Sequence, residues 1–216
     1  MKEFYKHWSE FRLLFRGGKL WKKDGWRNVI EHQAVQLRVV RIMSDLLGLS
    51  LEDKRALETV ALVHDWGKRI DKKPEDFIER DRSRALEMLN KVNPDEQLME
   101  ATGPGFIVLA INNSKRLSFL QYLQFYLDDI CSGSEIVPFD KRINEVELSR
   151  SDLNTDPDLT NRLGGNKYWD MERMVGHRVE QMIFDRLIER GVVIEDPSEI
   201  PALIKSRLCN SNSLDD

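Results

Sequence analysis

The chain has little of several features that would place it in a specialised class. Only two cysteines, Cys131 and Cys209, occur among 216 residues, too few for a disulfide framework. The longest uninterrupted apolar run, Phe106 to Ile111, is far too short to cross a bilayer. The N-terminus also lacks the apolar core and small-residue cleavage site of a secretion signal. We therefore expect a cytoplasmic protein without disulfides or a membrane span.

No charge of one sign dominates the chain either. The 33 Lys and Arg residues and 37 Asp and Glu residues leave a formal net charge of −4, which does not favour nucleic acid as a partner. The hydrophobic fraction of 41% and charged fraction of 32% are typical of a globular domain with a real core. These values predict a single domain over residues 1–216 and leave a homodimer open.

Apolar residues recur every three to four positions in nearly every patterned segment, which predicts helices. No segment alternates persuasively as a strand, apart from an extended piece near residues 191–195. The polar stretch 149–166 predicts a loop because it is rich in Asp and Asn and contains a Gly-Gly pair. An all-α domain is the consistent fold class. The expected helices span about residues 28–47, 51–66, 75–92, 97–102, 116–130 and 168–190, with a buried element over 106–112.

Histidine is scarce, and two of the four histidines lie on apolar helical faces. His32 shares the face of Val35 and Val39, so its imidazole is expected to point inward. His64 follows the stripe of the next helix and is joined directly to Asp65. A lone buried histidine is more often a hydrogen-bonded core residue than a ligand. An imidazole next to a carboxylate at a helix end nevertheless offers two metal ligands.

A second acidic feature, Asp128 and Asp129, closes the helix expected over 116–130. Carboxylates there face the negative end of the helix dipole, at a cost of about 0.3–1 kcal/mol unless a positive charge compensates. The alternative is an ordinary solvated helix end. Two inward histidines and two carboxylates would together form a nitrogen and oxygen site suited to a divalent metal.

This order of residues resembles the HD superfamily of metal-dependent phosphohydrolases, in which a His, a His-Asp pair and a distant Asp form the motif. Gly67 and Lys68 complete the His-Asp-x-Gly-Lys variant of the central motif, and the tract around Tyr126 to Arg142 is similar to the end of that domain. The resemblance covers about residues 28–145 and favours Asp128 over Asp129. It implies an HD-type helical bundle with a core at about 24–148 and a C-terminal helical extension at about 149–216.

The resemblance also implies a function, a ligand set and a substrate class. A divalent ion lowers the pKa of bound water toward about 7, so a phosphate ester of a nucleotide or similar small molecule would be hydrolysed by metal-activated water. The comparable stretch at Ile111 to Asn113 lacks further histidines, which favours one ion, chosen among Mn, Fe, Co, Ni, Zn and Mg. The alternative is a non-catalytic module that senses a nucleotide or a protein. The implied metal ligands are His32, His64, Asp65 and Asp128.

Catalytic roles follow from the same resemblance. Asp65 would also orient the water, and Lys68 would meet a phosphate as a point charge. Arg27 and Arg142 could each reach a phosphate or form an ordinary ion pair. Glu31 and Glu79 are candidates for proton transfer, although helical glutamates are usually only solvated. The aromatic and basic segment 4–23 packs on the domain, stacks on a base or rests on a membrane surface, and packing is the commoner role of such a segment.

Overall fold

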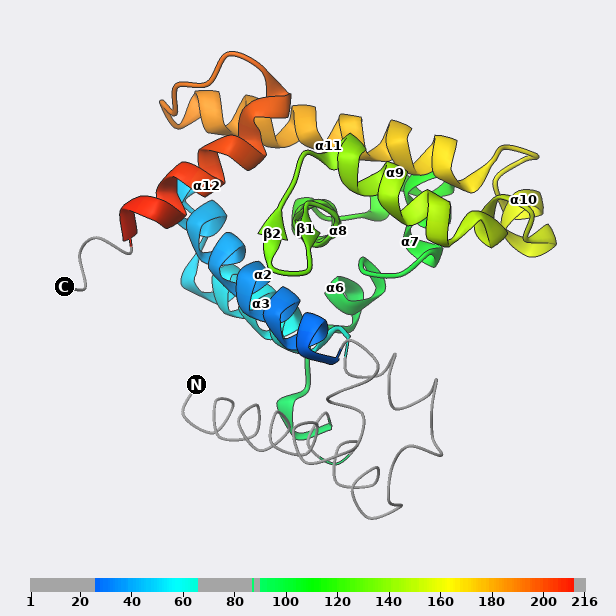
Figure 1. Cartoon of the computed structure of the whole chain (residues 1–216), viewed down its shortest axis with the longest axis horizontal. Coiled ribbons are helices and arrows are strands. Elements are labelled where there is room, and N and C mark those ends of the chain that lie inside the picture. The colour runs from blue at the N-terminus through cyan, green and yellow to red at the C-terminus, as the bar shows by residue number, and fades with distance from the viewer. Residues whose placement is uncertain (1–25, 66–86, 88–89, 212–216) are drawn as a thin grey trace.

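The computed structural model describes residues 26–65, 87 and 90–211, and the side chains at 26–31, 115, 210 and 211 lie outside this description. The described part is all-α, which confirms the expected fold class (Figure 1). Its only β-structure is an antiparallel hairpin of β1 (Cys131–Ser132) and β2 (Glu135–Ile136). The α-helices are α2 (Trp26–Leu46), α3 (Leu51–Val63), α6 (Glu96–Glu100), α7 (Gly105–Asn112), α8 (Phe119–Asp129), α9 (Phe139–Ser149), α10 (Pro157–Arg162), α11 (Tyr168–Glu189) and α12 (Ile200–Ser211).

Helices α2 and α3 form an antiparallel hairpin because a short turn joins them. Gly48 in this turn has φ +61°, a conformation that side chains with a Cβ rarely adopt. Ser50 then caps α3, since its hydroxyl accepts a hydrogen bond from the Asp53 backbone N–H at 3.1 Å. Together, the turn and the cap place the start of α2 beside the end of α3.

Helix α8 begins at Phe119, three residues later than the apolar pattern predicts. Ser118 caps it through a capping box with Gln121, whose side-chain oxygen accepts the Ser118 N–H at 2.9 Å. The preceding residues instead form a separate 3-10 turn, Ser114–Arg116. The capping chemistry therefore outweighs the apolar period at this boundary.

One prediction, a loop over the polar stretch 149–166, was wrong. The stretch 149–166 is not a plain loop: it contains a 3-10 turn, Ser151–Asn154, and helix α10. The Asp156 carboxylate accepts the N–H groups of Asp158 and Leu159, and Pro157 occupies the first helical turn, which starts α10 despite its polar composition. Residues 191–195 form no strand, and the hairpin lies at 131–136, where Gly133 has φ +58° at its turn.

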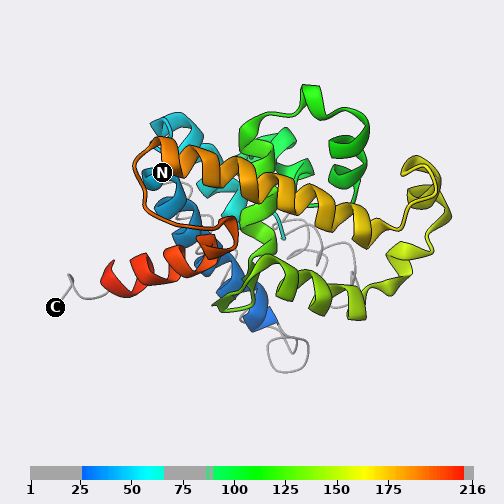
Figure 2. The ribbon, with the colours of Figure 1, turned by 90° about the horizontal axis from the view of Figure 1, so that it is seen from above.

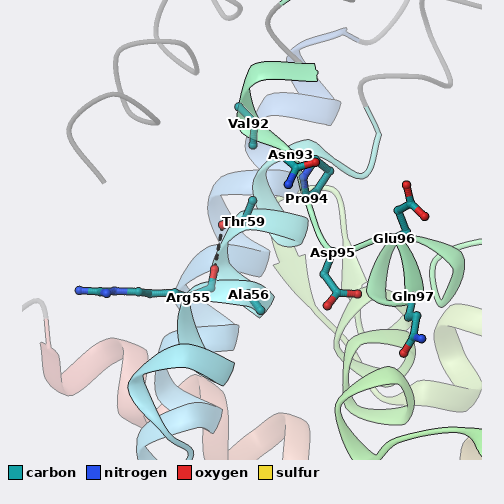
Figure 3. A pocket seen from close by; sticks show the side chains of 9 residues that line it. All are labelled: Arg55, Ala56, Thr59, Val92, Asn93, Pro94, Asp95, Glu96 and Gln97. Carbon is teal, nitrogen blue, oxygen red and sulfur yellow. Dashed lines mark hydrogen bonds between the residues drawn. The ribbon is translucent and has the colours of Figure 1, made fainter.

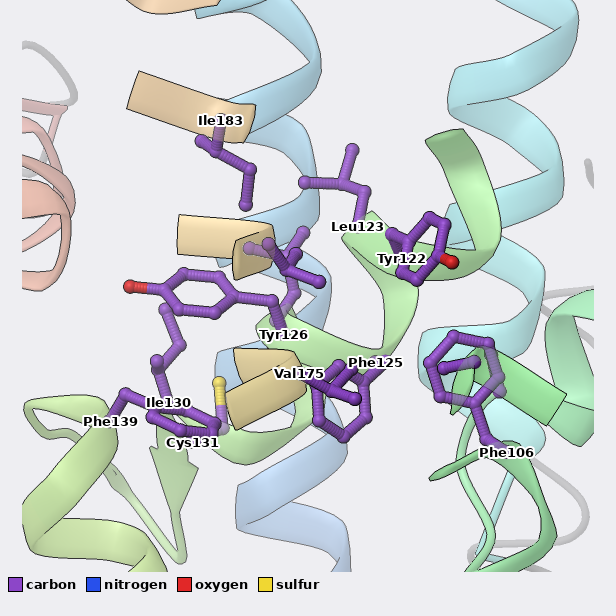
Figure 4. Close-up of a cluster of buried hydrophobic side chains, with 14 of the residues drawn as sticks. Phe106, Tyr122, Leu123, Phe125, Tyr126, Ile130, Cys131, Phe139, Val175 and Ile183 are labelled. Atoms are coloured by element: carbon purple, nitrogen blue, oxygen red, sulfur yellow. The ribbon is translucent and has the colours of Figure 1, made fainter. Parts of the chain in front are cut away.

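Aromatic side chains form the centre of the core (Figure 4). The Tyr126 ring of α8 stacks on Phe139 of α9, with ring centroids 5.9 Å apart. Phe125, the preceding residue, lies 5.2 Å from Phe106 of α7. A Cβ at Gly176 of α11 would lie 1.9 Å from the Phe139 ring, so only glycine allows α11 to approach so closely.

Helix α8 runs through the middle of the described part, and the other helices surround it (Figures 1 and 2). Helix α11 crosses above it, and α12, the end of the expected C-terminal extension, packs back against α2. No helix in the described ranges is both long and apolar enough to span a membrane.

Candidate metal centre

The hairpin of α2 and α3 brings the two inward histidines together. His32 lies in the second turn of α2 and His64 caps the end of α3, at nearly equal distances from the connecting turn. Their Nε2 atoms are 3.3 Å apart, and the rings meet edge to face. The His64 side chain has 0% of its surface exposed, so this pair lies inside the bundle.

Two carboxylates complete the cluster from different directions. Asp65 follows His64 directly, and its Oδ1 lies 3.6 Å from His64 Nε2. Asp128, the penultimate residue of α8, places its Oδ1 2.9 Å from His32 Nε2 and 3.2 Å from His64 Nε2. The structure therefore brings together all four side chains that the sequence selected as metal ligands.

These separations fit a shared ion. Ligand atoms bound at about 2.1 Å to one metal lie roughly 3.0–3.5 Å from one another, depending on the coordination geometry. The atoms of His32, His64 and Asp65 lie within 4.8 Å of one another, and the group could hold a metal ion. Asp128 contacts both imidazoles, so a fourth donor is at hand.

A backbone contact fixes which nitrogen of His64 faces the cluster. Its Nδ1 lies 3.2 Å from the carbonyl oxygen of Val60, one turn earlier in α3. Because a carbonyl only accepts hydrogen bonds, Nδ1 must carry the proton. With a metal ion bound, the Nε2 of His64 would present its lone pair to the ion, as a metal ligand requires. In the structure, this Nε2 lies within hydrogen-bonding distance of Asp128 Oδ1, at 3.2 Å.

Opposing effects set the charge of Asp128. Burial alone raises the pKa of its carboxyl, but the charge of His64 and hydrogen bonds from both histidines outweigh it and hold the pKa well below its usual value. Asp128 is thus an anion in a nearly buried setting, with 15% of its side chain exposed. The negative charge of Asp128 therefore favours binding of a cation at the centre of the cluster.

One buried acid near this cluster was missed at the sequence level. Glu172 of α11 is buried, and burial raises the pKa of its carboxyl to about 7, against the hydrogen bond from Tyr168 and the charge of Arg173. The negative charge of Asp128 raises this pKa further. The sequence pattern that could have revealed Glu172 is its helical spacing from Tyr168 and Val175, which places it on the buried face of α11.

Several predicted residues fall outside the described part of the chain. This applies to Lys68, to Glu79, to the segment 4–23, and to the side chains of Arg27 and Glu31. Their proposed roles stay predictions.

The pocket shown in Figure 3 lies between α3 and the approach to α6, and none of the four cluster residues lines it. Arg55 and Thr59 come from α3, and the Thr59 hydroxyl donates to the Arg55 carbonyl oxygen at 2.8 Å. Asp95 and Glu96 bring opposite charge from the other side. This mixed-charge lining indicates no particular ligand.

A search of protein-family models, curated proteins and solved structures found no match to this chain.

Proposed function

We propose that this protein is a metal-dependent phosphohydrolase of the HD type, acting on a phosphate ester of a nucleotide or similar small molecule. The observation that supports this most strongly is the group of His32, His64 and Asp65, whose ligand atoms lie within 4.8 Å of one another, with Asp128 Oδ1 2.9 Å and 3.2 Å from the two imidazoles. The order of these residues along the chain is the one that resembles the HD pattern. One divalent ion is the proposed cofactor.

A divalent ion in such a site supplies Lewis-acid activation of water and of a phosphoryl oxygen. The chain's own residues would prepare that chemistry. His32 and His64 would present their Nε2 atoms to the ion as neutral ligands, the second of them oriented by the Val60 carbonyl. Asp65 and Asp128 offset the ion's charge with two carboxylates, and Asp65, at 17% side-chain exposure, has an edge open to substrate and water.

Arg142 of α9 is a candidate contact for the substrate phosphate. Of the half-buried arginines whose side chains are described, Arg41 pairs with Glu58, and Arg173 pairs with Glu147. Arg142 has no carboxylate partner among the described residues and donates only to the Ser132 hydroxyl, at 3.3 Å. A guanidinium with free donors matches the geometry of a phosphate.

The charges of both Arg142 and Asp128 act on two buried groups, which supports a position of Arg142 near the cluster. Its positive charge and the negative charge of Asp128 both act on the buried Cys131 thiol: burial raises the pKa of that thiol, Asp128 adds to the rise, and Arg142 opposes it. Both groups also act on the Glu172 carboxyl. Arg142 therefore shares the neighbourhood of the cluster and supports an anionic substrate.

The test combines metal analysis with a screen for phosphate release from nucleoside mono-, di- and triphosphates. We expect one divalent ion per chain, and phosphate release that His64→Ala abolishes. Arg142→Lys keeps the charge but loses the fork of donors, so KM should rise about 10-fold while metal affinity stays unchanged.

Two outcomes would contradict the proposal. Phosphate release that survives His64→Ala would remove the cluster from the reaction. A protein that binds metal and nucleotide but releases no phosphate from any of them would instead be a non-catalytic sensing module.

A further inference from the structure

Two glutamine side chains beside the cluster bury polar atoms without partners. Gln36 of α2 and Gln124 of α8 are both 0% exposed. The Oε1 and Nε2 atoms of both amides are buried and form no hydrogen bond. Buried amides are normally paired, so four orphaned atoms next to a candidate site require an explanation.

Each glutamine lies one helical turn from a member of the cluster. Gln36 follows His32 by four residues, and Gln124 precedes Asp128 by four residues. Residues four apart share a helix face, and helical side chains lean toward the N-terminus. Gln36 therefore leans back toward His32, whereas Gln124 leans away from Asp128. Helix geometry therefore favours Gln36 over Gln124 as the amide nearer to a ligand.

The two histidines differ in the support that their outer nitrogen receives. His64 Nδ1 donates to the Val60 carbonyl, and this contact fixes its ring. The hydrogen bonds of His32 all use Nε2, toward His64 and Asp128. Within the described part of the chain, His32 Nδ1 has no acceptor. A metal-ligating histidine almost always donates its other N–H to an oxygen.

We propose that Gln36 is the positioning residue for His32: when a metal ion is bound, its Oε1, which has no hydrogen-bond partner among the described residues, would accept the His32 Nδ1–H and hold the Nε2 lone pair toward the shared centre. The inference rests on the proposed metal site and explains why a polar side chain occupies a fully buried position in α2. The amide of Gln36 then serves His32 as the Val60 carbonyl serves His64.

The first test separates stability from metal binding. In Gln36→Leu the orphaned amide is replaced by an apolar group of similar size, so the metal-free protein should be as stable as the wild type or more stable. Its affinity for Zn²⁺, measured by calorimetry against a competing chelator, should fall about 10- to 100-fold. Gln36→Glu keeps an acceptor at the same place and should recover most of that affinity.

Ser44→Ala is the matched control. Ser44 also lies on α2 and buries an unpaired hydroxyl, but three turns from His32. Its removal should leave Zn²⁺ affinity unchanged. Long-range ¹H–¹⁵N spectra of the Zn²⁺-loaded protein should show His32 protonated at Nδ1, with faster exchange of that proton in Gln36→Leu than in the wild type.

Unchanged Zn²⁺ affinity in Gln36→Leu would overturn this inference and leave the metal centre intact. An equal loss of affinity in Gln36→Leu and Ser44→Ala would overturn it as well, because general packing of α2 would then be the cause. A wild-type protein that binds no divalent ion would remove both the metal centre and the role of Gln36.

Discussion

Helix α8 contributes to two regions of opposite character. Phe125 and Tyr126 pack in the aromatic core with Phe139, whose ring meets Phe125 edge to face and stacks on Tyr126. A short distance along the helix, Gln124 and Asp128 bury an unpaired amide and an anion. Burial of the aromatic rings stabilises the fold, whereas burial of the polar groups lowers stability when no ligand binds them. A rigid core on one side allows α8 to hold Asp128 at a defined place on the other.

Removing an aromatic side chain should cause the largest loss of stability. Phe139→Ala deletes a ring that is 2% exposed and contacts both Phe125 and Tyr126. We expect the free energy of unfolding to fall by about 3–5 kcal/mol in chemical denaturation. Leu148→Ala, at a side chain that is 86% exposed, is the control and should change it by less than about 0.5 kcal/mol. Equal effects at both positions would contradict the location of the core.

A change in the polar region should affect ligand binding and spare the core. Asp128→Asn keeps the side-chain shape but removes the charge between the histidines, so divalent metal affinity should fall about 100-fold, or about 3 kcal/mol. Asp129→Asn, one residue along α8, should retain the affinity. Calorimetric titration with Zn²⁺ measures both variants. A larger loss in Asp129→Asn would show that the wrong carboxylate of the pair has been chosen.

The pH dependence of stability should reveal the buried acid between the two regions. The pKa of Glu172 is raised from 4.5 to about 7 in the folded protein, so the folded state binds this proton more tightly than the unfolded chain. The contribution of the protonated group is complete below pH 4.5 and is lost as pH rises to about 7, a fall of about 3 kcal/mol.

In metal-free protein, Glu172→Gln should remove the fall in the free energy of unfolding between pH 4.5 and about 7, as measured by denaturation at several pH values. Glu189→Gln, at an exposed position on the same helix, should keep it. A wild-type slope that persists in Glu172→Gln would assign the effect to another group.

The smallest effect is expected at the start of α3, whose far end carries His64. Ser50→Ala removes the hydroxyl that accepts the Asp53 N–H, which should lower stability by about 1 kcal/mol in thermal or chemical denaturation. Metal stoichiometry should stay at the wild-type value, because the cap is a full helix length from the ligands. A loss of bound metal would mean that the two ends of α3 are coupled.

Predictions from the sequence succeeded where local patterns were sufficient. The apolar periods of α2 and α3 depend on neighbours within one or two turns, so a single stretch of residues reveals them. The boundary of α8 and the presence of α10 were missed because single caps, at Ser118 and Asp156, outweighed the surrounding composition. Glu172 was missed because a charged residue in a helix is normally expected on the exposed face.

The amino-acid sequence alone determined the helical class and marked His32 and His64 as inward-facing, because apolar periodicity is a property of short segments, and the resemblance to the HD superfamily added Asp65 and Asp128 as ligands. Only the tertiary structure decided that the two Nε2 atoms lie 3.3 Å apart and within 3.2 Å of Asp128 Oδ1, that the Val60 carbonyl orients one imidazole, and that Gln36, one turn from the other, is fully buried. Distances between segments depend on how helices pack, and packing involves the whole chain at once.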